Sequence, residues 1–231
     1  MHLKVLHCFG GAAIRISSMN LTTFEYDDLT INIAHLYAPQ LKEIFLMDLG
    51  RPFPLARLSG LLNLEILRLH MSLEMDLYQI QKMPRNNTCF TSLKQLDLFV
   101  SCSDDDFDLL WLLSFLKTSP LLQKLVLTLT FGKFNENQKE IRKVDAIHHH
   151  NELKVLEMHG CVGNWYEIEF QLLILSIAKG LERLIISNST SIYAGDEKWV
   201  DLPREEEDCN QEMVQKQLQG HVPQGVELMF L

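Results

Sequence analysis

Leucine and other apolar residues recur along the chain in the pattern L-x-x-L-x-L, which puts their side chains on one side of a short extended segment. The frames begin at Leu3, Leu21, Leu41, Leu64, Leu93, Leu122, Leu153 and Leu181. Each frame predicts a strand followed by a return segment, and no single frame can bury its apolar face alone. We therefore expect the strands to stack, with each row of leucines packed against the next.

The distances between frames identify the kind of repeat. Successive starts from Leu64 onward lie 29, 29, 31 and 28 residues apart, near the roughly 20–29 residues of leucine-rich repeats. The turn position after the strand holds a small polar or thiol side chain in the last five frames: Ser72, Ser101, Thr130, Cys161 and Ser189. The frames at Leu21 and Leu41 have Leu29 and Leu49 there, so those repeats are degenerate.

These patterns predict an α/β leucine-rich-repeat solenoid (a horseshoe), with a curved parallel sheet on the concave face and helices or irregular returns on the convex face. The prediction is a single domain over 1–231, with about seven or eight repeats, degenerate over 1–60 and closed by a C-terminal cap at about 196–231. A strand begins close to residue 2 without a preceding cap. We therefore expect the C-terminal portion of a longer array, or a shortened family member.

Two return segments have the composition of helices. FDLLWLLSFLK at 107–117 follows a possible N-cap at Ser103, and YEIEFQLLILSIAK at 166–179 ends before Gly180. Both are apolar nearly all round, which indicates either close packing on the convex side or contact with another molecule. The returns at 36–40 and around Pro84 are expected to be irregular. At the C-terminus the sequence predicts a helix over 205–219 and a strand over 225–231.

Residues between the inward leucines are expected to face outward on the concave side of the sheet. This row mixes charged residues with Phe and Met, a composition that suits a protein partner. The candidate partner-binding residues are Arg68, His70, Asp97, Phe99, Glu157, His159 and Arg183. A merely solvated sheet face is the alternative for each of them.

Charge and cysteine content indicate which classes of partner are disfavoured and in which compartment the protein is expected. The net charge is −9 and no dense Lys/Arg cluster occurs, which argues against nucleic acid and anionic membrane surfaces as partners. No apolar run approaches the roughly 20 residues that span a bilayer. The 5 cysteines form no CxxC pair and the N-terminus lacks the apolar core of a signal peptide. These features predict a cytoplasmic or nuclear protein with reduced thiols.

The sequence contains no convincing constellation for catalysis. Three adjacent histidines at 148–150 could suggest a metal site, but without partners at ligand spacing they are better explained as a solvated turn. Asp104–Asp106 with Asp108 lack the glycine and glutamate of a calcium loop and suit helix capping instead. Cys161 is explained by its turn position. We therefore expect a non-enzyme that uses no cofactor and no metal.

Several stretches resemble the repeat region of plant F-box proteins, in particular the FBD-like family. APQLKEIFL at 38–46 and SPLLQKLVL at 119–127 are similar to its repeat openings, and 150–186 resembles its terminal block, with a Gly-x-x-Gly turn before an apolar helix. HVPQGVELMFL at 221–231 is similar to its ending. The resemblance implies recognition of protein substrates for a ubiquitin ligase.

One expected part of that family is missing from the sequence. Nothing here matches an F-box, the segment that would dock the adaptor of the ligase, and Ser187-Asn188 stand where the family usually has Asp-Pro. The ligase adaptor is therefore a partner only if an F-box is present elsewhere. The alternative is a stand-alone scaffold or decoy without a role in ubiquitin transfer.

Overall fold

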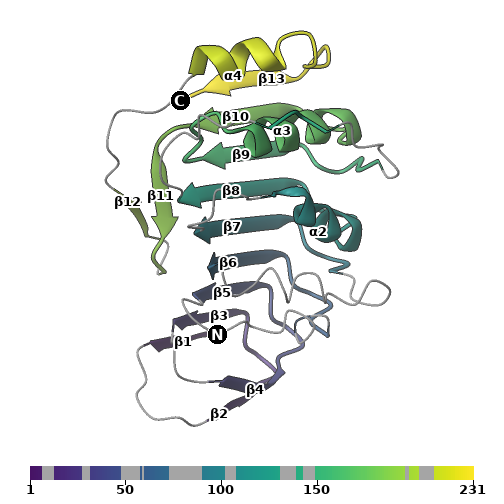
Figure 1. Ribbon diagram of the computed structural model, residues 1–231. Coiled ribbons are helices and arrows are strands. Elements are labelled where there is room, and N and C mark those ends of the chain that lie inside the picture. Colours follow the sequence, from purple (N-terminus) through teal and green to yellow (C-terminus); the bar gives the residue numbers. More distant parts are fainter. Residues whose placement is uncertain are drawn as a thin grey trace.

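A computed structural model describes residues 1–6, 13–27, 32–47, 58, 60–72, 90–101, 108–130, 139–142, 149–195, 198–202 and 211–231. Within these ranges, nine strands form one sheet, and every neighbouring pair is parallel. In order across the sheet they are β1 (His2–Leu6), β3 (Thr23–Asp27), β5 (Glu43–Met47), β6 (Ile66–Ser72), β7 (Gln95–Ser101), β8 (Lys124–Thr130), β9 (Val155–His159), β10 (Arg183–Ser187) and β13 (Glu227–Phe230). They stack in sequence order from one end of the molecule to the other (Figure 1).

The register of the sheet follows the leucine pattern. From β3 to β10, each sheet strand begins two residues after the first leucine of its frame, as at Leu64 and Ile66. The second apolar positions align in one row across the sheet: Phe24, Ile44, Leu67, Leu96, Leu125, Leu156 and Leu184, continued by Leu3 at one edge and Leu228 at the other. Leu3 therefore takes the second position of its repeat, and the predicted frame start at Leu3 is wrong. Burial of each buried side chain in this row stabilises the fold by about 1.5–3 kcal/mol. This arrangement confirms the predicted α/β solenoid.

Backbone hydrogen bonds also connect the residues that immediately precede neighbouring strands. The amide of Glu65 donates to the carbonyl of Lys42, that of Lys94 to Glu65, and that of Gln123 to Lys94, each at 2.8 Å. The Lys94 ammonium also lies 2.8 Å from the Glu65 carboxylate. Each repeat therefore holds the next by main-chain bonds as well as by its leucines.

His150 connects two successive turns from a buried position. Its Nδ1 accepts a hydrogen bond from the amide of Leu153 at 3.1 Å, and its Nε2 lies 3.0 Å from the carbonyl oxygen of Ser119. The first bond leaves Nε2 as the protonated nitrogen, which donates to Ser119. The expectation of a solvated turn is therefore wrong for His150, which has a structural role with both ring nitrogens engaged, although His149 beside it is exposed. His148 lies outside the described residues.

The first returns contain strands of their own. β2 (Ala13–Ser17) and β4 (Asn32–Tyr37) pair in parallel as a separate two-stranded sheet, at the lower end of the molecule in Figure 1. Ile16 and Ile33 from these strands are buried. The expectation of an irregular return at 36–40 is therefore wrong for Leu36 and Tyr37, whose backbone hydrogen bonds are met by strand pairing. Pro84, in the other return expected to be irregular, lies outside the described residues.

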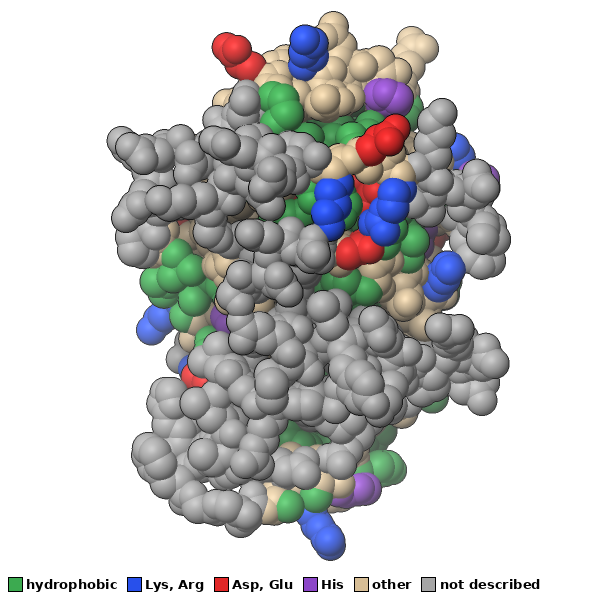
Figure 2. Space-filling model, viewed as in Figure 1, with side chains coloured by type: hydrophobic (Ala, Val, Ile, Leu, Met, Phe, Trp, Pro, Cys, Tyr) green, Lys and Arg blue, Asp and Glu red, His purple; other side chains and the backbone are tan. Residues whose placement is uncertain are grey.

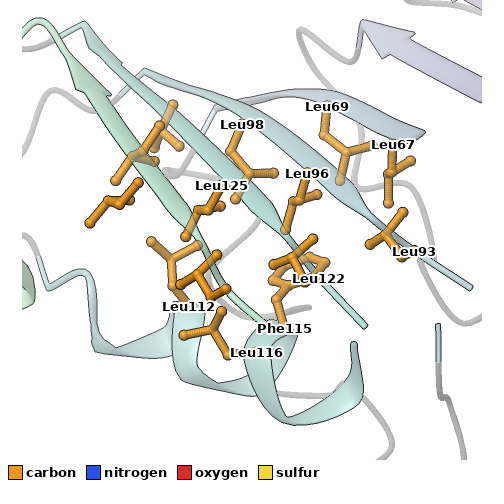
Figure 3. Close-up of a cluster of buried hydrophobic side chains, with 14 of the residues drawn as sticks. Leu67, Leu69, Leu93, Leu96, Leu98, Leu112, Phe115, Leu116, Leu122 and Leu125 are labelled. Carbon is orange, nitrogen blue, oxygen red and sulfur yellow. The ribbon is translucent and has the colours of Figure 1, made fainter. Parts of the chain in front are cut away.

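The first predicted helix is shorter than expected. A 3₁₀ turn, η2 (Leu110–Leu112), leads into α2 (Leu113–Thr118), and the carboxylate of Asp108 accepts a 2.8 Å hydrogen bond from the Leu110 amide. Phe115 and Leu116 pack toward the leucines of β6, β7 and β8 (Figure 3). The predicted cap, Ser103, and the aspartates at 104–106 lie outside the described residues.

The second predicted helix is α3 (Trp165–Ile177), and its start is fixed by one carboxylate. Glu167 Oε2 accepts hydrogen bonds from the amides of Val162, Gly163 and Asn164, at 3.0, 2.8 and 3.3 Å. These three donors would otherwise lie buried without partners at the entry to the helix. The Gly-x-x-Gly segment thus forms a tight turn closed by a side chain of the helix that follows.

The outer side of α3 is covered by the chain itself. Arg142 donates hydrogen bonds from Nε and Nη2 to the Glu169 carboxylate, at 2.8 and 2.6 Å, and its guanidinium lies 2.9 Å from the Asp108 carboxylate. Lys139 and Arg142 both lie over the ring of Trp165. An apolar helix that is buried nearly all round is therefore explained by packing, as one of the two sequence interpretations proposed.

Two elements follow β10 before the last strand. β11 (Thr190–Tyr193) and β12 (Trp199–Leu202) form an antiparallel hairpin, and α4 (Gln211–Leu218) precedes β13. The sequence predicted α4 from residue 205, but 203–210 lie outside the described residues. β13 pairs in parallel with β10 and extends the sheet by one strand. The segment expected to cap the solenoid, 196–231, therefore contains β13, the last strand of the sheet. It also contains β12, which pairs with β11 in the hairpin and does not pair with the sheet.

Candidate functional site

The outward side chains of the sheet form rows in register along the concave face. The central row runs Lys4, Glu25, Phe45, Arg68, Asp97, Val126, Glu157, Ile185 and Met229. Their chain neighbours on either side, such as Leu67 and Leu69, point into the core and are buried. The alternation that the leucine pattern predicts places these residues on the opposite side of the sheet from the core.

The hairpin β11–β12 folds back over this row. In Figure 1 it runs from β10 down past the carboxyl ends of the strands toward β6. Tyr193, at the end of β11, is buried there. The hairpin therefore lies against β8 and reaches Glu25 in β3, although it leaves the sheet at its C-terminal end.

Tyr193 is held by three strands of the sheet. Its hydroxyl donates a 3.2 Å hydrogen bond to Glu25 Oε1 in β3. Its ring meets that of Phe45 in β5 edge to face, with 4.9 Å between the centroids, and the guanidinium carbon of Arg68 in β6 lies 4.6 Å from its centroid. The phenol is therefore bound through a hydrogen bond of its hydroxyl, a T-shaped ring contact and a cation–π contact.

Arg68 is fixed in place by two carboxylates. Its Nη1 donates to Glu43 and its Nε to Asp97 Oδ2 at 3.0 Å. Asp97 also accepts hydrogen bonds from Gln95. Burial raises the pKa of Asp97, while Gln95 and the charge of Arg68 act against this shift. The guanidinium beneath Tyr193 is therefore oriented by the sheet and not by the hairpin.

His70 packs against the aromatic rings of Phe45 and Phe99. Its ring is 5.3 Å from that of Phe45 and 4.6 Å from that of Phe99, measured between centroids. Burial lowers the pKa of His70 to about 4, against the opposing effect of a hydrogen bond with the Tyr193 backbone. His70 is therefore neutral at ordinary pH.

A cavity remains between the hairpin and the sheet. It is small, about 20 Å³, and partly open to solvent. Its lining includes Arg68, His70, Asp97, Phe99, Tyr193 and Trp199. Four of the seven residues predicted to bind a partner therefore come together at one place, under a cover that the chain itself provides.

The remaining predicted residues lie on the other half of the concave face. Glu157 pairs with Lys124 at 2.8 Å and with His159 at 3.8 Å. The hydrogen bond from His159, together with Lys124, lowers the pKa of Glu157 to about 2 even though burial opposes the shift. Arg183 is exposed at the start of β10. These side chains are accessible to solvent, unlike those beneath the hairpin.

Charged groups also gather on the face shown in Figure 2. Lys and Arg side chains lie next to Asp and Glu in the upper part of that view, with hydrophobic side chains beside them.

Among the described residues, no three His, Cys, Asp or Glu side chains converge as metal ligands would. Asp108, one of the four aspartates considered as a calcium loop, instead accepts a hydrogen bond from the Leu110 amide and forms an ion pair with Arg142. No helix in the described part of the chain has the length and apolarity needed to cross a membrane.

The hairpin is the feature that sequence reasoning missed. Its signal is present as two short runs rich in β-forming residues, TSIY at 190–193 and KWVDL at 198–202, on either side of Gly195. Gly195 has a positive φ of 82°, which favours glycine. Nothing in the leucine pattern shows where such a hairpin would dock, because Tyr193 contacts Glu25, Phe45 and Arg68, which lie more than a hundred residues away in the sequence.

Comparison with known proteins identifies the repeat. The model of one family, described as the At1g61320/AtMIF1 leucine-rich-repeat domain, matches residues 1–229. A search of curated proteins and a search of solved structures found no match. With nearly the whole chain matched and the parallel sheet built on the leucine frames, the protein belongs to the At1g61320/AtMIF1 family of leucine-rich-repeat domains.

Proposed function

We propose that this domain binds a protein partner through its concave face, performs no catalysis, and acts as the substrate-recognition region of a ubiquitin-ligase receptor when joined to an F-box. Solenoids commonly use extended concave surfaces for binding. Support comes from the family, a leucine-rich-repeat domain, and from the resemblance of 150–186 to plant F-box proteins. The cytoplasm or nucleus, where ubiquitin ligases of this kind act, is the proposed location.

One observation carries the proposal. The outward residues stand in register on nine strands and include aromatic, basic and acidic side chains in contact with one another, as Arg68 with Asp97 and Phe45 with His70. Interfaces concentrate their affinity in such aromatic and arginine anchors. The open half, with Glu157 and Arg183, adds charges that select a partner and set its orientation.

Affinity purification with mass spectrometry tests partner binding. The full-length protein is compared with Arg183→Glu, on the open concave face, and with the control Lys117→Glu, an exposed position on α2. We expect the first change to deplete a specific partner several-fold, because it reverses a charge at the interface. The control should retain the partner. Equal recovery from both variants would contradict binding through the concave face.

The role in ubiquitin transfer needs a separate measurement. If the domain works as a ligase receptor, a cullin-ligase adaptor should co-purify with the full-length protein, and the partner should accumulate when cullin ligases are inhibited. A partner recovered without the adaptor, and with an unchanged lifetime, would instead indicate a scaffold or decoy. Fluorescent fusions would test the proposed location.

A further inference from the structure

We propose that Glu25, Phe45 and Arg68 form a binding site for a tyrosine side chain of the protein partner, and that β11–β12 occupies this site as an intramolecular ligand until the partner displaces it. We call these three residues the tyrosine site. The inference rests on the proposed function, since it names the side chain by which a partner would be recognised.

The chemistry of the site matches a phenol at each point. Glu25 is 3% exposed, and its carboxylate accepts a hydrogen bond from the hydroxyl of Tyr193. The guanidinium of Arg68 lies over the face of the ring, and the ring of Phe45 packs against it in a T-shaped arrangement. Phenylalanine would keep the ring contacts but lose the hydrogen bond to Glu25. The site therefore discriminates in favour of tyrosine.

The site belongs to the sheet. Glu25, Phe45 and Arg68 are direct neighbours in the register of β3, β5 and β6. Lys4 lies 3.3 Å from Glu25, and Arg68 is held by Glu43 and Asp97. None of these fixing contacts comes from the hairpin. The site therefore keeps its geometry when Tyr193 leaves, and it can accept the same group from another chain.

The hairpin is an appendage that can detach. Its strands are four residues each, and an isolated two-stranded hairpin is only marginally stable. The sheet does not need it, because β10 continues to β13 by direct pairing. Trp199 and Val200 are about half exposed in β12. Opening therefore breaks the contacts between the hairpin and the sheet and leaves the nine-stranded sheet intact.

Opening would uncover a surface suited to a protein partner. Phe45 and His70 are 3% and 5% exposed, and both lie against Tyr193. Aromatic residues beside a fixed arginine are typical of the core of an interface. The hairpin thus covers the part of the concave face that has the strongest character of a binding site.

A peptide in trans tests the proposal with the whole chain. The probe is a fluorescently labelled synthetic peptide with the sequence of residues 188–202, and binding is followed by fluorescence anisotropy. In the wild type the internal hairpin competes at a high effective concentration. We expect Tyr193→Ala to bind the peptide at least about tenfold more tightly than the wild type does.

Variant peptides and proteins test the specificity. With Tyr193→Ala protein, a peptide that carries Phe in place of Tyr should bind about tenfold more weakly, and one that carries Ala should not bind measurably. Adding Glu25→Gln to the protein should weaken binding of the Tyr peptide. Glu212→Gln, an exposed position on α4, makes the same chemical change away from the site and should have no effect.

Two results would overturn the inference. One is a folded Tyr193→Ala protein that does not bind the peptide saturably, and the other is equal binding of the Tyr and Ala peptides. If Tyr193→Ala does not fold, Tyr193→Phe replaces it and should bind the peptide more tightly than the wild type. Loss of the fold in Tyr193→Phe as well would show that the hairpin is an integral part of the fold.

The peptide assay and affinity purification can fail separately. Peptide binding without any captured cellular partner would support the tyrosine site and contradict the proposed function. Capture of a partner through the concave face, together with no peptide binding, would contradict only the tyrosine site.

Discussion

Tyr193 and Glu25 are separated by 168 residues in the sequence, yet the hydroxyl of Tyr193 donates a 3.2 Å hydrogen bond to the Glu25 carboxylate. Glu25 belongs to β3, the second strand of the sheet, and Tyr193 belongs to the hairpin that follows β10, the eighth strand. This bond is the longest-range side-chain hydrogen bond among those described here, and both its partners are buried.

Removing this hydroxyl should destabilise the protein. Tyr193→Phe keeps the ring contacts but removes a donor to a buried carboxylate, so we expect the free energy of unfolding to fall by about 1–3 kcal/mol. Urea denaturation followed by circular dichroism measures the change. Tyr37→Phe, at a half-exposed tyrosine, should cost less than about 0.5 kcal/mol. Equal effects of the two changes would contradict the importance of the Glu25 bond.

His70 should make the protein sensitive to mild acid. Its pKa is lowered to about 4 in the folded state, whereas an unfolded histidine has a pKa of about 6.5. Between these values the unfolded state binds more protons, so stability falls as the pH drops from about 6.5 to 4. At pH 5 we expect a loss of about 2 kcal/mol relative to pH 7.5 from this group.

Denaturation curves at several pH values test the role of His70. His70→Gln should remove this part of the pH dependence, whereas the matched change at the exposed His221 should leave it in place. A wild-type slope in the His70→Gln variant would show that another group is responsible.

Gly160 is required by its surroundings as well as by its backbone. Its φ is 75°, and a Cβ at this position would lie 2.0 Å from the carbonyl oxygen of Leu129 in the preceding repeat. Gly160→Ala should therefore cost at least about 3 kcal/mol, since backbone strain and a main-chain clash add together. Gly220→Ala, with φ 87° and open space around the Cβ, should cost only about 1 kcal/mol. Thermal unfolding compares the two.

The Glu167 carboxylate should matter more than the surface carboxylates. Glu167→Ala leaves the amides of Val162, Gly163 and Asn164 without their common acceptor, and we expect a loss of about 2–4 kcal/mol. Glu182→Ala, which removes an exposed ion pair with Lys154, should change stability by less than about 1 kcal/mol. Comparable losses would mean that water replaces the carboxylate at the helix start.

The leucine frames were sufficient to predict the sheet, because a strand in a solenoid is stabilised by the equivalent strand beside it. The same positions that predicted strands at Leu64 and Leu93 set the observed register. The helix at α3 was also predictable, since its stop signal at Gly180 and its apolar run are local features. In each case the information lies within one repeat.

The arrangement of the candidate partner-binding residues was predictable only in part. Arg68, His70, Asp97 and Phe99 do meet at one place, because alternation along a strand fixes which side of the sheet they face. Their cover was not predicted, since the docking of Tyr193 on Phe45 depends on the three-dimensional position of three strands. The strands β2 and β4 escaped prediction because they fall in the degenerate repeats at 1–60 and stabilise each other across two returns.

The position of the hairpin late in the chain affects how the molecule is made. Synthesis on the ribosome proceeds from the N-terminus, so Glu25, Phe45 and Arg68 emerge well before Tyr193 exists. Strands can stack as they appear, since each needs only its predecessor. A nascent chain therefore presents this aromatic and charged surface uncovered, and closing it over a separation of 168 residues is a late step of folding.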